Sequence, residues 1–221
     1  MSKINIYCLP GSTAVAFAGR FLEESGISVF KEMSPQVTHL LCPVPTRSPV
    51  DAPEGITVIG GNIPAGIDLL RDPFYLTENA AITARCAISL IGMELKGLPV
   101  LVLGWGRIGK CLGKFLADAG AEVTIAARKP EDVAMIRALG YKGMFIQKAC
   151  AQGFGAVLNT VPAMVLDASG ADCLLMELAS QPGITGDNIL DARGLPGKYA
   201  SEESGRLIAE TILRILKEEE E

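Results

Sequence analysis

Short apolar runs separated by turn residues dominate the first 77 residues of the chain. Residues 4–9, 27–30, 37–42 and 56–59 are such runs, and their length and flanking turns predict β-strands. Residues 14–25 instead repeat apolar positions at helical spacing and stop at Gly26, a typical helix terminator. Strands joined by a helical crossover predict a small parallel sheet over residues 1–77.

A single helical pattern then runs from residue 78 to residue 95 and ends at Lys96-Gly97. It lies between two segments that both read as alternating strands and helices. We therefore predict a linker helix over residues 78–97 that connects two domains.

The remaining chain alternates strands and helices more regularly. Strands are predicted at residues 99–103, 122–127, 143–146, 156–161, 173–178 and 188–191, and helices at 107–119 and 130–139. This alternation predicts an α/β fold, a doubly wound parallel Rossmann sheet over residues 98–200, preceded by a smaller, flavodoxin-like α/β domain. Residues 201–221 are predicted to form an amphipathic C-terminal helix and an acidic tail that frays.

A glycine-rich loop, Gly104-Trp-Gly-Arg-Ile-Gly109, directly follows the strand at residues 99–103 and opens a helix. In this setting the three glycines allow a tight turn, a close approach to a pyrophosphate, and tight packing of the helix. The pyrophosphate would bind the free N–H groups of the helix N-terminus. The alternative is a glycine-rich turn in a degenerate fold that binds nothing. We predict a dinucleotide site that contains Gly104, Trp105, Gly106, Arg107, Ile108 and Gly109.

The end of the next strand indicates which dinucleotide binds. An NAD site needs a carboxylate there for the adenosine ribose, but this position is Ala127, about 18 residues past Gly109, and Arg128 and Lys129 follow. A guanidinium can pair with a 2′-phosphate, so the sequence favours NADP(H), with NAD as the other candidate. The competing interpretation treats Arg128 and Lys129 as ordinary solvated residues at a strand end.

Three further loops follow strands of the same sheet, and the carboxyl ends of parallel strands share one edge. The first contains Thr160, Val161 and Pro162, which we predict to lie near the nicotinamide ribose. The second contains Ser180 and Gly183, and the third spans residues 193–198. Each loop by itself is compatible with a purely structural turn, but together they favour a pocket.

Composition narrows the class of protein. The 221 residues carry a net charge of −5 and no dense basic stripe, so a nucleic-acid partner is not expected. No apolar stretch reaches the length of a membrane span, and the first strand leaves no room for a secretory signal, so we expect a cytoplasmic protein. A single histidine and the absence of a C-x-x-C pair argue against a metal site.

The loops together resemble the A subunit of dipicolinate synthase, an enzyme of sporulating bacteria that makes pyridine-2,6-dicarboxylate. The resemblance covers roughly residues 79–217 and is carried by residues 79–88, 100–109, 120–129, 159–166, 178–183 and 194–198. It implies a two-domain fold related to 2-hydroxyacid dehydrogenases and NAD(P)-dependent oxidation of a dihydrodipicolinate-type dicarboxylate. It also implies a flavoprotein-type B subunit as partner, and we further expect a homo-oligomer.

The chain departs from that family at two places. Its N-terminal part is shorter than is typical of the family, and the usual Thr-x-Glu-Gly of the linker is replaced by Thr83-Ala-Arg-Cys86. Arg85 could bind a substrate carboxylate, or it could mark a paralogue with another substrate. We predict a substrate site in the domain cleft formed by Asn79, Thr83, Arg85, Ser180 and Gly183.

The sequence leaves two functions open and gives no catalytic acid or base. His39, the only histidine, lies in a predicted strand and is interpreted as structural, so a 2-hydroxyacid dehydrogenase reaction, which needs a later histidine, is disfavoured. One hypothesis is an oxidoreductase of the dipicolinate synthase type. The other is a non-catalytic NADP(H)-binding accessory or sensor module, and a scaffold with an empty Rossmann site is the weakest alternative.

Overall fold

The computed structural model describes residues 4–218, and its chain forms two compact units. The N-terminal unit comprises Met1–Ile82 together with Pro196–Glu221, and the second unit comprises Thr83–Leu195. The C-terminal helix therefore folds with the N-terminal unit, although more than a hundred residues separate the two in sequence. The predicted fraying at residues 219–221 lies outside the described residues.

The N-terminal unit is built on five parallel strands. The predicted flavodoxin-like α/β domain is confirmed, because the strand order β2-β1-β3-β4-β5 is that of flavodoxin-like sheets. His39 lies on the central strand, where Thr38 Oγ1 is 2.8 Å from its Nδ1. The strands are β1 (Asn5–Cys8), β2 (Ser28–Phe30), β3 (His39–Leu41), β4 (Thr57–Gly60) and β5 (Ile67–Asp68).

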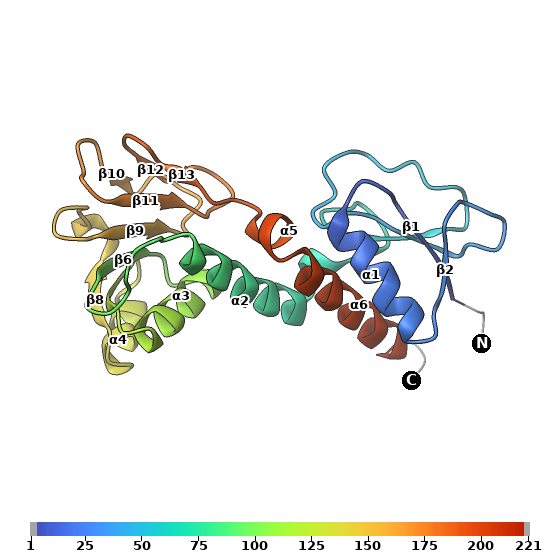
Figure 1. The fold of residues 1–221 in the computed structure, drawn as a ribbon, viewed down its shortest axis with the longest axis horizontal. Coiled ribbons are helices and arrows are strands. Elements are labelled where there is room, and N and C mark those ends of the chain that lie inside the picture. The colour runs from blue at the N-terminus through green and yellow to red at the C-terminus, as the bar shows by residue number, and fades with distance from the viewer. Residues whose placement is uncertain (1–3, 219–221) are drawn as a thin grey trace. The chain divides into compact units, whose positions relative to one another are not determined.

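Two helices of this unit, α1 (Thr13–Glu24) and α6 (Ser201–Glu218), lie side by side (Figure 1). They approach closely at Gly205, where an added Cβ would lie 2.5 Å from Phe17 Cβ and 2.7 Å from Ala14 O. A glycine is thus required at the helix crossing. The amphipathic pattern of the last helix serves this contact, since its apolar face is buried.

The linker helix α2 (Pro73–Ser89) begins and ends earlier than the predicted residues 78–97. Its start is set by Asp72, whose carboxylate accepts a hydrogen bond from Tyr75 N at 2.7 Å and forms an ion pair with Arg214 of α6. Burial raises the pKa of Asp72, but these two partners outweigh it and lower that pKa overall. A φ of 66° at Gly92 turns the chain away soon after the helix ends.

The second unit contains the predicted Rossmann sheet, and the strand order confirms it. The order β13-β11-β9-β6-β7-β8 corresponds, counted within this unit, to the Rossmann order 3-2-1-4-5-6 read from the other edge. Its central strands are fully buried apolar runs, as parallel sheets require. The strands are β6 (Pro99–Leu103), β7 (Glu122–Ala127), β8 (Lys142–Phe145), β9 (Ala156–Asn159), β11 (Leu174–Glu177) and β13 (Leu190–Asp191).

The two halves of this sheet are connected differently. In the first half the strands are joined through α3 (Arg107–Asp118), α4 (Pro130–Ala138) and the short 3-10 turn η2 (Ile146–Lys148). Between Ala156 and Asp191, a fully described stretch, the connections hold no helix and instead form the paired strands β10 (Leu166–Asp167) and β12 (Ile184–Thr185). The remaining elements are η1 (Leu69–Arg71) and α5 (Leu195–Tyr199).

Two kinds of feature are absent from residues 4–218. No helix in that range has both the length and the apolar character needed to cross a bilayer. No three His, Cys, Asp or Glu side chains in the same range are grouped as ligands for a metal ion.

Candidate nucleotide site

The glycine-rich loop connects β6 to α3 and leaves the N-terminus of α3 uncapped by any side chain. Gly104 has a φ of 106°, a left-handed conformation that favours glycine. Gly106 is the N-cap residue of α3 and has extended backbone, with a φ of −78°. A Cβ added at Gly106 would meet nothing within 4 Å. A side chain at position 106 would therefore enter open space at the start of α3, where no side chain caps the helix.

The third glycine has a different role. A Cβ at Gly109 would overlap the carbonyl oxygen of Gly104, so the first turn of α3 packs directly on the loop that precedes it. Thr160 supports the loop from the end of β9, because its hydroxyl donates to Leu103 O at 2.8 Å and lies against Gly104. The loop is thus shaped by backbone contacts that tolerate no side chain at position 109.

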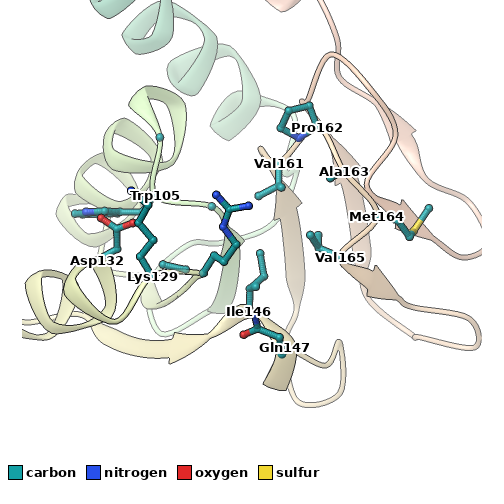
Figure 2. A pocket seen from close by; sticks show the side chains of 14 residues that line it. Trp105, Lys129, Asp132, Ile146, Gln147, Val161, Pro162, Ala163, Met164 and Val165 are labelled. Atoms are coloured by element: carbon teal, nitrogen blue, oxygen red, sulfur yellow. The ribbon is translucent and has the colours of Figure 1, made fainter.

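A cavity of about 710 Å³ opens at this loop, at the carboxyl edge of the Rossmann sheet. In Figure 2, Trp105, Lys129 and Asp132 lie on one wall, and the segment from Val161 to Val165 lies on the opposite wall. The cavity is lined by Gly104, Trp105, Gly106, Ala127, Arg128, Lys129, Asp132, Ile146, Gln147, Val161, Pro162, Ala163, Met164 and Val165.

The corner formed by the end of β7 is positively charged. Ala127 is buried, whereas Arg128 and Lys129 are exposed along the cavity. Lys129 lies 4.0 Å from Glu131, but within the described residues no hydrogen bond or ion pair engages Arg128. An unpaired guanidinium on the cavity wall is available for an anionic ligand group.

The structure adds cavity residues that the sequence analysis missed. Asp132 is in the first turn of α4, and Ile146 and Gln147 follow β8 directly. The rule that ligands lie outside the carboxyl ends of parallel strands would have pointed to the residues after β8. Ala163, Met164 and Val165 lie further along the fully described connection after β9, which contains no helix and reaches the short strand β10 only at Leu166.

Eight of the twelve predicted cofactor residues line this cavity, and the other four do not. Arg107 and Ile108 are in the first turn of α3, and Gly109 and Thr160 pack behind the loop. None of the predicted substrate residues lines it. Asn79, Thr83 and Arg85 are on α2, where the Arg85 guanidinium lies 5.9 Å from the ring centre of Phe115, and Ser180 and Gly183 are in the loop after β11.

A buried Asn–Glu pair fixes the wall that contains Val161. Glu177, at the end of β11, is only 5% exposed. Its two carboxylate oxygens accept hydrogen bonds from Asn159 Nδ2 at 2.8 and 3.0 Å, from Ala179 N at 2.9 Å and from Gly183 N at 2.8 Å. A buried carboxylate needs such donors to offset its lost hydration.

Asn159 connects Glu177 to the cavity wall. Its Oδ1 accepts a hydrogen bond from Val161 N, and its Nδ2 donates to Val161 O, both at 3.0 Å. Gly183 closes the arrangement, because a Cβ there would lie within 2.6 Å of the carbonyl oxygen of Ala163. We call Asn159, Glu177 and Gly183 the clamp. Gly183 packs within the clamp, and its place at the substrate stays a prediction from the sequence.

Trp105 is the only tryptophan of the chain and lies on the cavity wall. Its ring meets Tyr141 edge to face at a centroid distance of 6.2 Å, and Lys110 Nζ lies 5.6 Å from the ring centre. These contacts hold the indole in place next to the glycine-rich loop. Its fluorescence therefore reports on this site alone.

Comparison with known proteins identifies relatives of the chain. No protein-family model matches it. Over 151 residues, or 62% of the chain, it is 30% identical to the A subunit of dipicolinate synthase from Bacillus subtilis (strain 168). The match covers 51% of that protein, so the chain matches about half the length of this curated relative.

Two crystal structures have the same fold. The dipicolinate synthase A subunit from Bacillus halodurans gives a TM-score of 0.80 at 21% identity, covering 97% of this chain and 98% of that chain. The corresponding polypeptide of dipicolinate synthase from Bacillus subtilis gives 0.79 at 19% identity, with coverages of 99% and 97%. At these identities the likeness establishes the fold of both units.

Proposed function

This chain is a homologue of the dipicolinate synthase A subunit in sequence and fold, and on that premise we propose that it is an NADP-dependent oxidoreductase. Its proposed reaction oxidises a dihydrodipicolinate-type dicarboxylate to pyridine-2,6-dicarboxylate in the cytoplasm. The observation that carries the proposal is the cavity at the glycine-rich loop, with an open helix N-terminus at Gly106 and an unpaired guanidinium at Arg128. Homo-oligomer formation and a flavoprotein-type B subunit are part of the same proposal.

Different residues of the chain would bind the pyrophosphate, the 2′-phosphate and the nicotinamide ribose of NADP. The N–H groups at the start of α3 would hold the pyrophosphate, since the positive end of a helix favours an anion. Arg128 would pair with the 2′-phosphate, and Lys129 would add a second cation. Val161 and Pro162, fixed by the clamp, would border the nicotinamide ribose.

The bound cofactor supplies the hydride chemistry, and the chain supplies position and shelter from water. In the proposed reaction the substrate would lose a hydride from a ring C–H group to the bound cofactor and a proton to a base as the ring becomes aromatic. Of the residues that line the cavity, only Arg128, Lys129 and Asp132 are charged. All three lie at the end that would hold the adenosine, so no acid or base on the cavity wall takes the departing proton.

That absence from the cavity wall favours a second candidate, a non-catalytic NADP(H)-binding accessory or sensor module. Both candidates need the cofactor site, and they differ only in turnover. Neither candidate depends on the substrate residues predicted from the sequence, Asn79, Thr83, Arg85, Ser180 and Gly183.

The first experiment titrates the full chain with NADPH and with NADH and follows Trp105 emission and thermal unfolding. We expect NADPH to quench Trp105 by energy transfer to the reduced nicotinamide. We also expect it to raise the unfolding temperature more than NADH does, because a ligand that binds only the folded state stabilises it by mass action. If neither nucleotide changes Trp105 emission or the unfolding temperature, both candidate functions are wrong.

Turnover separates the two candidates once NADPH binding is seen. Dihydrodipicolinate generated in situ is supplied with NADP⁺, and dipicolinate is followed by its absorbance. Product formation supports the oxidoreductase. Bound cofactor without product, both with and without a B subunit, supports the module.

The nucleotide preference is expected to reverse in the double variant Ala127→Asp, Arg128→Ala. The aspartate can accept hydrogen bonds from the ribose hydroxyls of NADH and repels a 2′-phosphate, while the guanidinium that pairs with that phosphate is removed. Arg128→Ala alone should lower the affinity for NADPH about tenfold, because it removes a hydrogen bond to a charged group. Trp105 titrations measure both affinities.

Lys114→Ala is the matched control for the cofactor corner, because Lys114 is exposed on the same unit, pairs with Asp118 and lies off the cavity. It should leave both affinities unchanged. An Arg128→Ala chain that still prefers NADPH to the original extent would remove Arg128 from the 2′-phosphate and reopen NAD as the cofactor.

A further inference from the structure

A second cavity lies at the topological switch point of the N-terminal sheet. In the order β2-β1-β3-β4-β5 the chain runs from β1 to one side and from β3 to the other, so the connections after these two strands diverge. Ligands of open α/β sheets bind outside the carboxyl ends of the strands at such a point. Here the strand ends are level, since Cys8 is paired with Leu41 and Leu9 N donates to Leu41 O at 2.8 Å.

The cavity is about 470 Å³ in volume, and its walls come mainly from the two diverging connections. Leu9 and residues 11–13 follow β1, and residues 43–50, apart from Val44, follow β3. The wall carries one guanidinium, from Arg47, and no carboxylate. Its polar side chains are the hydroxyls of Ser12, Thr13, Thr46 and Ser48.

Arg47 is held at this place by its neighbour Thr46. The Thr46 hydroxyl donates to Pro43 O at 2.8 Å, and Thr46 N donates to Gly61 O at 2.8 Å. The base of the loop is therefore tied to the chain just after β4. Arg47 itself is exposed and forms no hydrogen bond or ion pair within the part of the chain that the structure describes.

From the cavity, its single unpaired guanidinium and its hydroxyls, we propose that this switch-point cavity binds a carboxylate of the dicarboxylate substrate. Guanidinium groups bind carboxylates through two parallel hydrogen bonds, and the hydroxyls of Ser12, Thr13 and Ser48 can donate to the remaining lone pairs. The absence of a carboxylate from the wall removes the repulsion that an anion would otherwise meet. The proposal rests on the proposed function only in naming the dicarboxylate, since the carboxylate chemistry comes from the cavity.

The cavity also differs from its neighbour. A second hollow of about 560 Å³ shares residues 46–50 with it but includes Asp51 on its wall. Arg47 borders both, so the carboxylate-free side is the one that suits an anion. None of the substrate residues predicted from the sequence lies on this wall, and the subsite is additional to them.

The test is calorimetric titration of the full chain with pyridine-2,6-dicarboxylate. We expect saturable binding, an affinity at least tenfold lower in Arg47→Gln, and an unchanged affinity in Arg71→Gln. Arg71 is the control because it belongs to the same unit, its side chain is 79% exposed, and it does not line the cavity. Pyridine, which lacks both carboxylates, should not bind.

Each outcome decides between distinct alternatives. Equal affinity in Arg47→Gln and the unchanged chain, or no dicarboxylate binding in a chain that binds NADPH normally, overturns the subsite and leaves the cofactor proposal standing. Competition by inorganic phosphate with the same dependence on Arg47 shows a general anion pocket and overturns the carboxylate assignment. Dicarboxylate binding that depends on Arg47 in a chain without NADPH binding keeps the subsite and overturns the proposed oxidoreductase.

Discussion

Gly106→Ala is expected to weaken NADPH binding by roughly 10- to 100-fold while leaving the stability of the protein unchanged to within about 0.5 kcal/mol. The backbone at Gly106 has a φ of −78°, which alanine adopts without strain, and the new methyl group would meet no protein atom within 4 Å. The methyl would instead occupy the space through which a pyrophosphate reaches the start of α3. A cost of about 1–3 kcal/mol is usual for one added methyl group in a filled site.

Gly109→Ala is the counterpart, because its methyl group would overlap the backbone of Gly104. We expect it to lower both the unfolding temperature and NADPH affinity. Thermal unfolding and Trp105 titration, applied to both variants, separate a blocked ligand from a distorted loop. A Gly106→Ala chain that binds NADPH normally would show that no pyrophosphate lies at this helix N-terminus.

Glu177→Gln is expected to destabilise the second unit by about 2–4 kcal/mol and to weaken NADPH binding as well. A glutamine has one carbonyl oxygen, so its amide group must face at least one of the donors Asn159, Ala179 and Gly183. A buried donor without a partner costs about 1–3 kcal/mol. The loss reaches the cavity because Asn159 holds the backbone of Val161 on both sides.

Glu122→Gln is the matched control for the clamp, since Glu122 belongs to the same sheet but has a side chain 56% exposed and pairs with Lys142 at the surface. It should change neither stability nor affinity. The double variant Asn159→Asp, Glu177→Gln restores one donor–acceptor match across the pair, so it should regain part of the lost NADPH affinity relative to Asn159→Asp alone. Clamp variants with lower unfolding temperature but unchanged NADPH affinity would contradict the link between the clamp and the cavity.

Local sequence patterns predict much of the fold. The central Rossmann strands are short, mostly apolar runs and glycines mark many of the turns, so a parallel α/β sheet could be inferred from the alternation of strands and helices. The linker helix shows where local patterns fail. Its start at Pro73 depends on Asp72, and Asp72 is held by Arg214, which is 142 residues away in sequence.

The candidate site likewise has one part that local sequence predicts and one part that depends on contacts between distant segments. The glycine-rich loop and the Ala127–Arg128 corner are contiguous segments, and their geometry follows from the strand and helix on either side. The clamp joins the ends of two strands that are neighbours only in the sheet, and no local sequence pattern marks Glu177. Pairing across β9 and β11 brings its carboxylate to Asn159 and buries both.

The sequence by itself determined that a dinucleotide-type loop follows a buried strand and that no carboxylate stands at the end of the next strand. Both features are local, because the backbone geometry at each place depends on adjacent residues. Tertiary structure alone decided which side chains wall the cavity, that Gly183 belongs to the clamp, and that Arg47 lies at a switch point of the N-terminal sheet. These features depend on contacts between distant segments, and such contacts form only when the strands take their order in the sheet.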